Sequence, residues 1–389
     1  MQRPRYILPV IVLAQFAGGS LWFAGNAVMP GLIRDVGLAP EAVSQVTSAV
    51  QLGFIIGTLL FAFTALSDRV PARLLFMGCA ILGGCANGVI PLLGTGLYSL
   101  LLLRFATGFF LAGIYPIGMK IAASWFEKGL GLALGYLVGA LVLGTAFPHA
   151  LSVLGKQLDW KWVLWALSFL AVMGGVGLAW WVPEGPFGKA GARFEPSVLG
   201  RMFQDKEFRA ASFGYFGHMW ELYAFWTFVP WLFQRYLLGK LPLSLSTGAF
   251  VIIGIGAVGC AVGGHLSQRF GSAWIARICL LFSGIGCLLS PFLAFLPPWL
   301  ALGFLLIWGF AVVGDSPQFS ALAAATAPPE YVGSALTIMN CIGFAITIFT
   351  IEWLGWLLQG NYAQWAFLCL LPGPLFGLWS LRVLSPRKS

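Results

Sequence analysis

The sequence is dominated by long apolar runs, separated by short segments that carry most of its charges. A bilayer core about 30 Å thick is crossed by a helix of about 20 apolar residues, which satisfies its own backbone hydrogen bonds in lipid. The runs predict twelve such helices, at residues 6–29, 45–66, 74–93, 98–118, 130–152, 162–182, 211–234, 246–267, 275–296, 299–321, 333–357 and 363–384. The chain is therefore expected to be an all-α membrane protein.

Composition excludes the soluble classes. Apolar residues make up 59% of the 389 positions and charged residues only 9%, whereas soluble domains average about 25% charged residues. A chain of this length with a water-facing surface would carry roughly three times as many charges. The 17 tryptophans and 50 glycines are typical of lipid-embedded helices, in which Trp marks the interface and Gly allows close packing.

The positive charges indicate orientation rather than nucleic-acid binding. The net charge is +9, but the cations are scattered singly and form no basic run. With a cytoplasmic N-terminus, sixteen Lys and Arg lie on the cytoplasmic side and five on the other, and Arg104 is left inside the membrane. The positive-inside rule then predicts that both termini are cytoplasmic, in a multi-pass protein of the cell (inner) membrane.

The chain is predicted to consist of two six-helix halves. Residues 183–210 form the one long polar stretch, so we expect a helical bundle at 1–182, a cytoplasmic linker at 183–210 and a second bundle at 211–389. Three segments also recur about 200 positions later: 64–71 at 264–271, 113–116 at 314–317, and 131–134 at 333–336. Duplicated halves of this kind are common in secondary transporters.

With these features the sequence resembles the major facilitator superfamily over essentially its whole length. The family's loop motif after the second helix, G-x-x-x-D-R-x-G-R-[RK], is matched by Asp68, Arg69 and Arg73, although Thr64 and Pro71 replace its glycines. The second copy keeps Gly264, Arg269 and Gly271, with Gln268 in place of Asp, and the R-x-x-x-G motif of helix four is matched by Arg104 and Gly108. The resemblance implies twelve transmembrane helices in two pseudo-symmetric six-helix bundles.

The resemblance also bears on the direction of transport. Drug exporters of the family carry G-P-x-x-G-G in helix five. Here Gly139 is followed by Ala140 where that motif has proline. This departure favours uptake by symport over export by antiport.

Three ionisable residues of the second half are expected inside membrane spans, His218 and Glu221 near the midplane and Asp315 in the cytoplasmic half of its helix. His218 and Glu221 lie one turn apart in the seventh helix, in a stripe with Tyr215 and beside Trp220. Asp315 lies two residues before Pro317 in the tenth helix, where a kink and a gate are expected, or else it pairs with a cation near the cytoplasmic entrance. Because charges in lipid are costly, we predict that His218, Glu221 and Asp315 carry protons, with Glu221 as the coupling carboxylate and His218 as its neighbour. A bonded helix–helix contact is the alternative.

The substrate path is predicted from polar residues on facing helices. Arg104 and Tyr115 share a face of the fourth helix, where the arginine either contacts an anion or bonds main-chain carbonyls. The predicted substrate-binding residues are Gln15, Trp22, Asn26, Gln51, Arg104, Tyr115, Tyr215, Trp220 and Asn340. By family resemblance, Asp68, Arg69, Arg73 and Arg269 form a conformational latch that holds the halves together in one state.

The predicted function is secondary active transport, not enzymatic catalysis. The chain has no nucleotide-binding loop, H-E-x-x-H, G-x-S-x-G or paired metal ligands, so no cofactor or metal is expected. We expect proton-coupled symport of a small organic solute, an anion being one option, by a protein that works as a monomer without nucleic acid. The alternatives are a proton-driven exporter of drugs or metabolites, a lipid-type flippase and, last, a membrane-embedded sensor or enzyme.

Overall fold

The computed structural model describes residues 4–94, 96–126, 130–154, 159–187, 202–327 and 331–384. The chain divides into two compact units, Met1–Gly191 and Ala192–Ser389. The boundary falls within the expected linker 183–210, of which residues 188–201 lie outside the described part. Ten helices of the described residues are long and apolar enough to cross a membrane.

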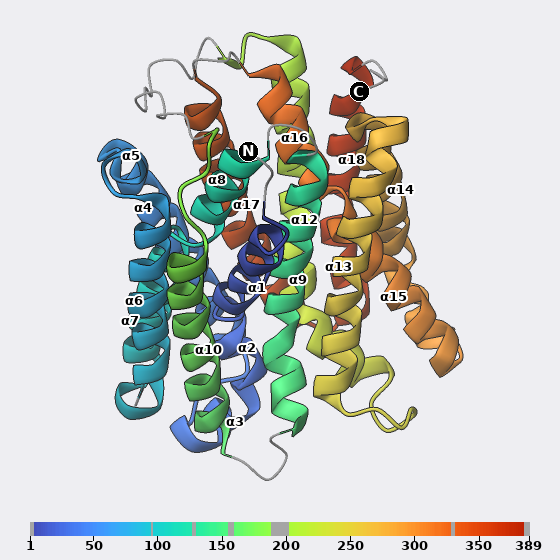
Figure 1. Cartoon of the computed structure of the whole chain (residues 1–389). Coiled ribbons are helices and arrows are strands. Elements are labelled where there is room, and N and C mark those ends of the chain that lie inside the picture. The colour runs from blue at the N-terminus through green and yellow to red at the C-terminus, as the bar shows by residue number, and fades with distance from the viewer. Residues whose placement is uncertain are drawn as a thin grey trace. The chain divides into compact units, whose positions relative to one another are not determined.

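The N-terminal unit is a bundle of helices (Figure 1). It comprises α1 (Ile7–Gly19), α2 (Ala24–Ala27), α3 (Met29–Val36), α4 (Ala42–Phe63), α5 (Leu66–Arg69), α6 (Ala72–Leu93), α7 (Leu97–Leu111), α8 (Tyr115–Trp125), α9 (Leu130–Leu154) and α10 (Trp160–Trp181). Helix α4 packs on α7, α6 packs on α7 and α10, and α1 packs on α9 and α10. The buried apolar residues of the unit lie on these packed helices.

The C-terminal unit repeats this plan. It comprises α12 (Lys206–Tyr236), α13 (Leu245–Phe270), α14 (Ser272–Leu289), η2 (Ser290–Phe295), α15 (Pro298–Gly314), α16 (Ser316–Thr326), α17 (Val332–Leu357), η4 (Ala363–Leu370), α18 (Pro372–Ser380) and η5 (Leu381–Val383). Helix α13 packs on α15, and α12 packs on α17 and α18. Each of the twelve expected ranges is thus helical over most of its length, and the all-α membrane fold is confirmed.

The first expected span, 6–29, is not one continuous helix. Helix α1 ends at Gly19, four residues of turn follow, and α2 and α3 continue the chain. The Ser20 hydroxyl donates to the Ala17 carbonyl at 2.7 Å. The main-chain carbonyls of Leu21 and Trp22, at this break, accept hydrogen bonds from Arg104. Tertiary contacts therefore hold the break, and the apolar pattern of the sequence does not reveal them.

Two other spans break at equivalent places in the repeat. Helix α7 ends at Leu111 and α8 begins at Tyr115, just before Pro116. Helix α15 ends at Gly314 and α16 begins at Ser316, just before Pro317. Proline lacks an N–H group and cannot continue the bonding of the preceding helix, but it is tolerated in the first turn of a new helix, where Pro116 and Pro317 lie. The expected interruption at Pro317 is therefore present, and Asp315 lies at it.

Close helix crossings also recur in both units. A Cβ atom added to Gly57 would lie 2.4 Å from the Phe109 carbonyl oxygen, where α4 meets α7. A Cβ at Gly259, 202 positions later, would lie 2.3 Å from the Phe310 carbonyl oxygen, where α13 meets α15. Membrane helices that approach this closely need small residues at the crossing.

Candidate functional site

The clearest buried charge contact of the C-terminal unit joins α12 to the break between α15 and α16. The Nδ1 atom of His218 lies 2.8 Å from Oδ1 of Asp315, and both side chains are 1% exposed. The contact is an ion pair when His218 is protonated. The rings of Phe319 and Tyr215 lie within 5.7 Å and 6.0 Å of the imidazole. An ionised carboxylate in such a place needs a partner, and His218 is that partner.

Glu221 has different partners. Its Oε1 atom accepts hydrogen bonds from Trp308 Nε1 at 2.6 Å and from Cys287 Sγ at 3.3 Å. His218 was expected to act as the neighbour of Glu221, one turn away on α12, but its contact at 2.8 Å is with Asp315, and its effect on Glu221 stays a prediction. The two acids form separate sites because α14 and α15 provide donors that the spacing along α12 does not indicate.

The other predicted substrate-binding residues of this unit, Tyr215, Trp220 and Asn340, do not lie together. Tyr215 is buried next to His218. Trp220 instead donates its Nε1–H to the Cys369 carbonyl at 2.9 Å, and its ring lies beside Phe349. Asn340 is half-buried on α17. The structure therefore brings Tyr215 next to His218, whereas Trp220 contacts the main chain of Cys369 and the ring of Phe349.

In the N-terminal unit, Arg104 bonds protein atoms around the break after α1. Its guanidinium donates to the main-chain oxygens of Leu21 at 3.0 Å and Trp22 at 2.5 Å, and to Asn87 Oδ1 at 2.9 Å. The side chain is fully buried. This is the carbonyl-bonding alternative expected for Arg104, and it holds the turn between α1 and α2 in place. A contact with an anion stays a prediction.

Four polar residues connect the segment after α1 to α4. Trp22 Nε1 donates to Gln51 Oε1 at 3.2 Å, and Asn26 Nδ2 donates to Thr47 Oγ1 at 2.8 Å. All four side chains are at most 5% exposed. The structure thus unites three of the predicted substrate-binding residues, Trp22, Asn26 and Gln51, in one cluster, which we call the amide cluster together with Thr47.

Gln15 and Tyr115 are buried in a different part of the same unit. Both amide atoms of Gln15 lack a hydrogen-bond partner among the described residues. A Cβ atom at Gly118 would lie 2.2 Å from Gln15 Oε1, which places Gln15 against α8. Tyr115 begins α8 and is 7% exposed.

The loop residues predicted to form a latch make contacts inside their own units. Asp68 accepts from Lys120 Nζ at 2.6 Å, and the same ammonium group donates to the Ser67 carbonyl. Arg73 donates to the Ala179 carbonyl and lies 4.0 Å from Glu184. Arg69 is exposed, and the Arg269 guanidinium lies 5.3 Å from the Phe270 ring centre. These contacts hold the loop in shape, while the latch between halves stays a prediction.

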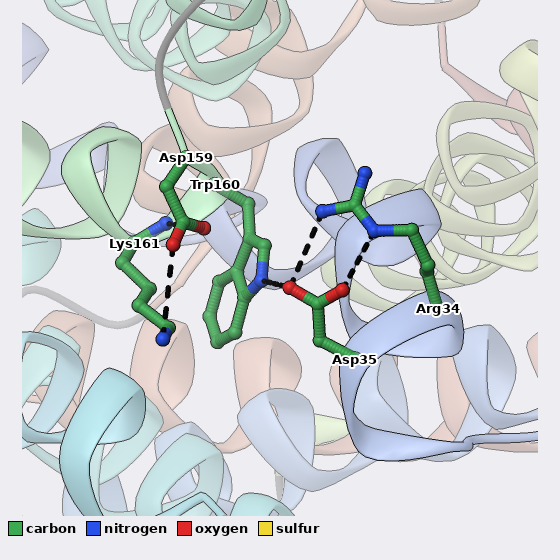
Figure 2. A network of polar contacts seen from close by, with 5 residues as sticks. All are labelled: Arg34, Asp35, Asp159, Trp160 and Lys161. Atoms are coloured by element: carbon green, nitrogen blue, oxygen red, sulfur yellow. Dashed lines mark hydrogen bonds and ion pairs between the residues drawn. The ribbon is translucent and has the colours of Figure 1, made fainter.

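Sequence reasoning missed a polar network where α3 meets α10 (Figure 2). Asp35 accepts from Arg34 at 2.6 Å and from Trp160 Nε1 at 2.7 Å, and Lys161 lies 3.7 Å from Asp159. The Arg34 and Trp160 donors lower the pKa of Asp35 to about 2. Only the neighbouring opposite charges of Arg34 and Asp35 were visible in the sequence.

Other missed partners are Lys120, Thr47, Trp308 and Cys287. The sequence did not single them out, because each lies far along the chain from the residue that it bonds, or is of a residue type that is common in apolar helices. A lysine inside the eighth helical segment was the one signal that could have been followed.

Together, the bundles of apolar helices and the buried ionisable groups define a polytopic membrane protein. A family model described as Major Facilitator Superfamily matches residues 11–351. The chain belongs to this superfamily of transporters, which are not enzymes. The resemblance drawn from its motifs is confirmed.

Three curated relatives are similar to the chain. Inner membrane transport protein YdhP of Escherichia coli K12 is 25% identical over 87% of both chains. A chloramphenicol resistance protein of Streptomyces lividans is 27% identical over 69% of this chain and 68% of its own length. A D-galactonate transporter of Escherichia coli O6:H1 is 29% identical over 33% of this chain, which spans 31% of that relative.

A solved structure is similar over nearly the whole chain. The human organic anion transporter MFSD10 (TETRAN) matches with a TM-score of 0.73 at 15% identity, covering 98% of this chain and 100% of that one. At this identity the likeness concerns the fold.

Proposed function

We propose that this membrane transporter couples the movement of a small organic solute to protons, by symport, in the inner membrane. The single observation that carries the coupling is the ion pair between His218 and Asp315. In the proposal both termini are cytoplasmic, and the transporter works as a monomer.

The position of Asp315 gives it a means of coupling. It stands between the last residue of α15 and the first of α16, where the helix is already interrupted, and its partner lies on α12. Protonation of Asp315 removes the charge that attracts a protonated His218, while loss of the pair leaves a costly buried charge. A proton on this carboxylate therefore favours a different arrangement of α12 and α16.

Glu221 is a second proton carrier in the proposal, acting apart from His218. Hydrogen bonds from Trp308 and Cys287 stabilise its ionised form. Glu221→Gln retains an acceptor oxygen for both donors and cannot ionise. Comparing it with Asp315→Asn separates the contributions of the two acids.

Proton-driven export is the second candidate function. The observation that favours it is the similarity to the chloramphenicol resistance protein over 69% of the chain. Symport and antiport move protons in opposite directions relative to the solute, so one assay tests both.

The experiment uses purified protein in liposomes containing a pH-sensitive dye. D-galactonate and chloramphenicol, taken from the names of the relatives, lead a panel of labelled solutes, and uptake is measured with and without an imposed pH gradient. For a transported solute, symport acidifies the interior as the solute enters, whereas exchange makes it alkaline. A solute that accumulates without any proton movement would refute the coupling.

Variants then locate the coupling. Asp315→Asn is expected to abolish gradient-driven accumulation while preserving exchange of solute across the membrane. Glu41→Gln, at an exposed carboxylate preceding α4, is the matched control and should accumulate solute like the wild type. Cysteine labelling at Thr95 and Ala190, both outside the described residues, tests the orientation, because the proposal places them on opposite sides.

A further inference from the structure

The amide cluster fixes the orientation of two buried side-chain amides. The two hydrogen bonds of the cluster join the same segments: Trp22 and Asn26 are four residues apart, as are Thr47 and Gln51 on α4. Because Thr47 and Gln51 both belong to α4, they lie on one face of that helix, about 6 Å apart along its axis. The two amides therefore lie within about one helical turn of each other.

The partner of Gln51 determines which end of its amide is used. An indole N–H only donates hydrogen bonds, so the group facing Trp22 must be the Gln51 oxygen. The Gln51 amino group consequently points elsewhere. It is buried and has no hydrogen-bond partner among the described residues.

For Asn26, the hydrogen-bond partner requires the amino end of the side-chain amide rather than the oxygen. The Thr47 hydroxyl already donates its single proton to the Val43 carbonyl at 2.7 Å, so toward Asn26 it only accepts. Asn26 must therefore present its amino group to Thr47 and leave its oxygen turned away. That oxygen is also buried and has no hydrogen-bond partner in the described part of the chain.

The cluster thus presents one unused donor and one unused acceptor. A buried polar group without a partner costs about 1–3 kcal/mol, so two such groups of complementary kind at one place indicate a site for a ligand. Arg104, which bonds the main chain of Leu21 and Trp22 and the side chain of Asn87, keeps its charge, and its Nε has no partner among the described residues. The neutral class follows instead from Asn26 Oδ1, because this acceptor needs an N–H or O–H that a carboxylate lacks. The free groups of Asn26 and Gln51 carry no charge.

We infer that the amide cluster is a subsite for an uncharged group with an adjacent hydrogen-bond donor and acceptor, such as a carboxamide or a pair of hydroxyls. Gln51 Nε2 donates to the oxygen of that group, and Asn26 Oδ1 accepts from its N–H or O–H. Trp22 and Thr47 hold the two amides in these orientations. The inference rests on the proposed transport of a small organic solute and specifies the neutral class of that solute.

The test compares ligands that differ only in charge. D-galactonamide and D-galactonate carry the same hydroxyls, but the first ends in an amide and the second in a carboxylate. Chloramphenicol is a second uncharged probe with an amide and hydroxyls. Thermal unfolding of the purified full-length protein is followed by circular dichroism across a concentration series of each compound, which gives a Kd from the shift in melting temperature.

The expected result is stabilisation by at least one uncharged probe, with D-galactonate at least tenfold weaker than D-galactonamide. Gln51→Glu keeps an oxygen for Trp22 but replaces the donor with an acceptor, so it should bind the neutral probe at least tenfold more weakly, measured against its own unfolding temperature without ligand. Gln359→Glu, the same change at an exposed position, should bind like the wild type.

Three results would overturn the inference: no stabilisation by either uncharged probe, preference for the carboxylate, or equal binding by Gln51→Glu. Asn26→Asp retains the acceptor oxygen and provides a second variant should Gln51→Glu fail to fold, and it should keep binding better than Asn26→Leu. Because this binding assay needs no proton gradient, the inference can fail while proton coupling holds, and Asp315→Asn can lose coupling while neutral binding persists.

Discussion

The close approach of α4 and α7 predicts that adding a methyl group at Gly108 lowers the stability of the N-terminal unit. A Cβ atom at Gly108 would lie 2.0 Å from the Val50 carbonyl oxygen, and one at Gly53 would lie 2.0 Å from the Phe105 carbonyl oxygen. Real Cβ contacts are essentially never shorter than 3.0 Å, so Gly108→Ala must move the two backbones apart by about 1 Å. Adding a methyl group to a well-packed interface costs about 1–3 kcal/mol. We expect Gly108→Ala to destabilise the N-terminal unit by that amount.

The assay is thermal unfolding in detergent, followed by the loss of helical circular dichroism at one fixed heating rate. Gly78→Ala is the matched control, because it places the same methyl group on α6 with nothing within 4 Å. Gly309→Ala tests the repeated crossing, since its Cβ would lie 2.1 Å from the Ile252 carbonyl oxygen. If Gly108→Ala melts at the same temperature as Gly78→Ala, the close approach does not limit stability and the reasoning is refuted.

Three further predictions concern charged residues. Arg104→Lys keeps the charge but cannot reach all three acceptors, so each lost partner should cost about 1–3 kcal/mol in the same unfolding assay; unchanged melting would contradict this. Asp68→Asn removes the ion pair with Lys120, worth at most about 1 kcal/mol at partly exposed groups, and should slow transport at normal expression; wild-type turnover would argue against the latch. Because the pKa of Asp35 is lowered to about 2, its contact with Trp160 should persist as the pH falls through 4 and be lost near pH 2. The infrared carboxylic-acid band that disappears in Asp35→Asn reports this, and a band that titrates near pH 4 would contradict it.

Much of the fold could be read from the sequence because lipid imposes a simple requirement. Backbone groups in the bilayer must be bonded within a helix, so twelve apolar runs predict twelve helical segments. The kink expected at Pro317 is present, whereas the equivalent break before Pro116 was not predicted, although the repeat places 113–116 opposite 314–317. The break after α1 was not predicted, because it depends on Arg104, which lies more than 80 residues away and bonds the Leu21 and Trp22 carbonyls.

The sequence alone determined which residues are chemically unusual: a few ionisable or amide side chains among apolar neighbours, where each unpaired polar group is costly. Only the tertiary structure decided how they pair. Spacing along α12 suggested that His218 meets Glu221, yet neighbouring helices offer each a better partner, Asp315 in one case and Trp308 in the other. Periodicity fixes the face of a helix on which a side chain lies, but the opposing residue depends on how that helix packs against the others.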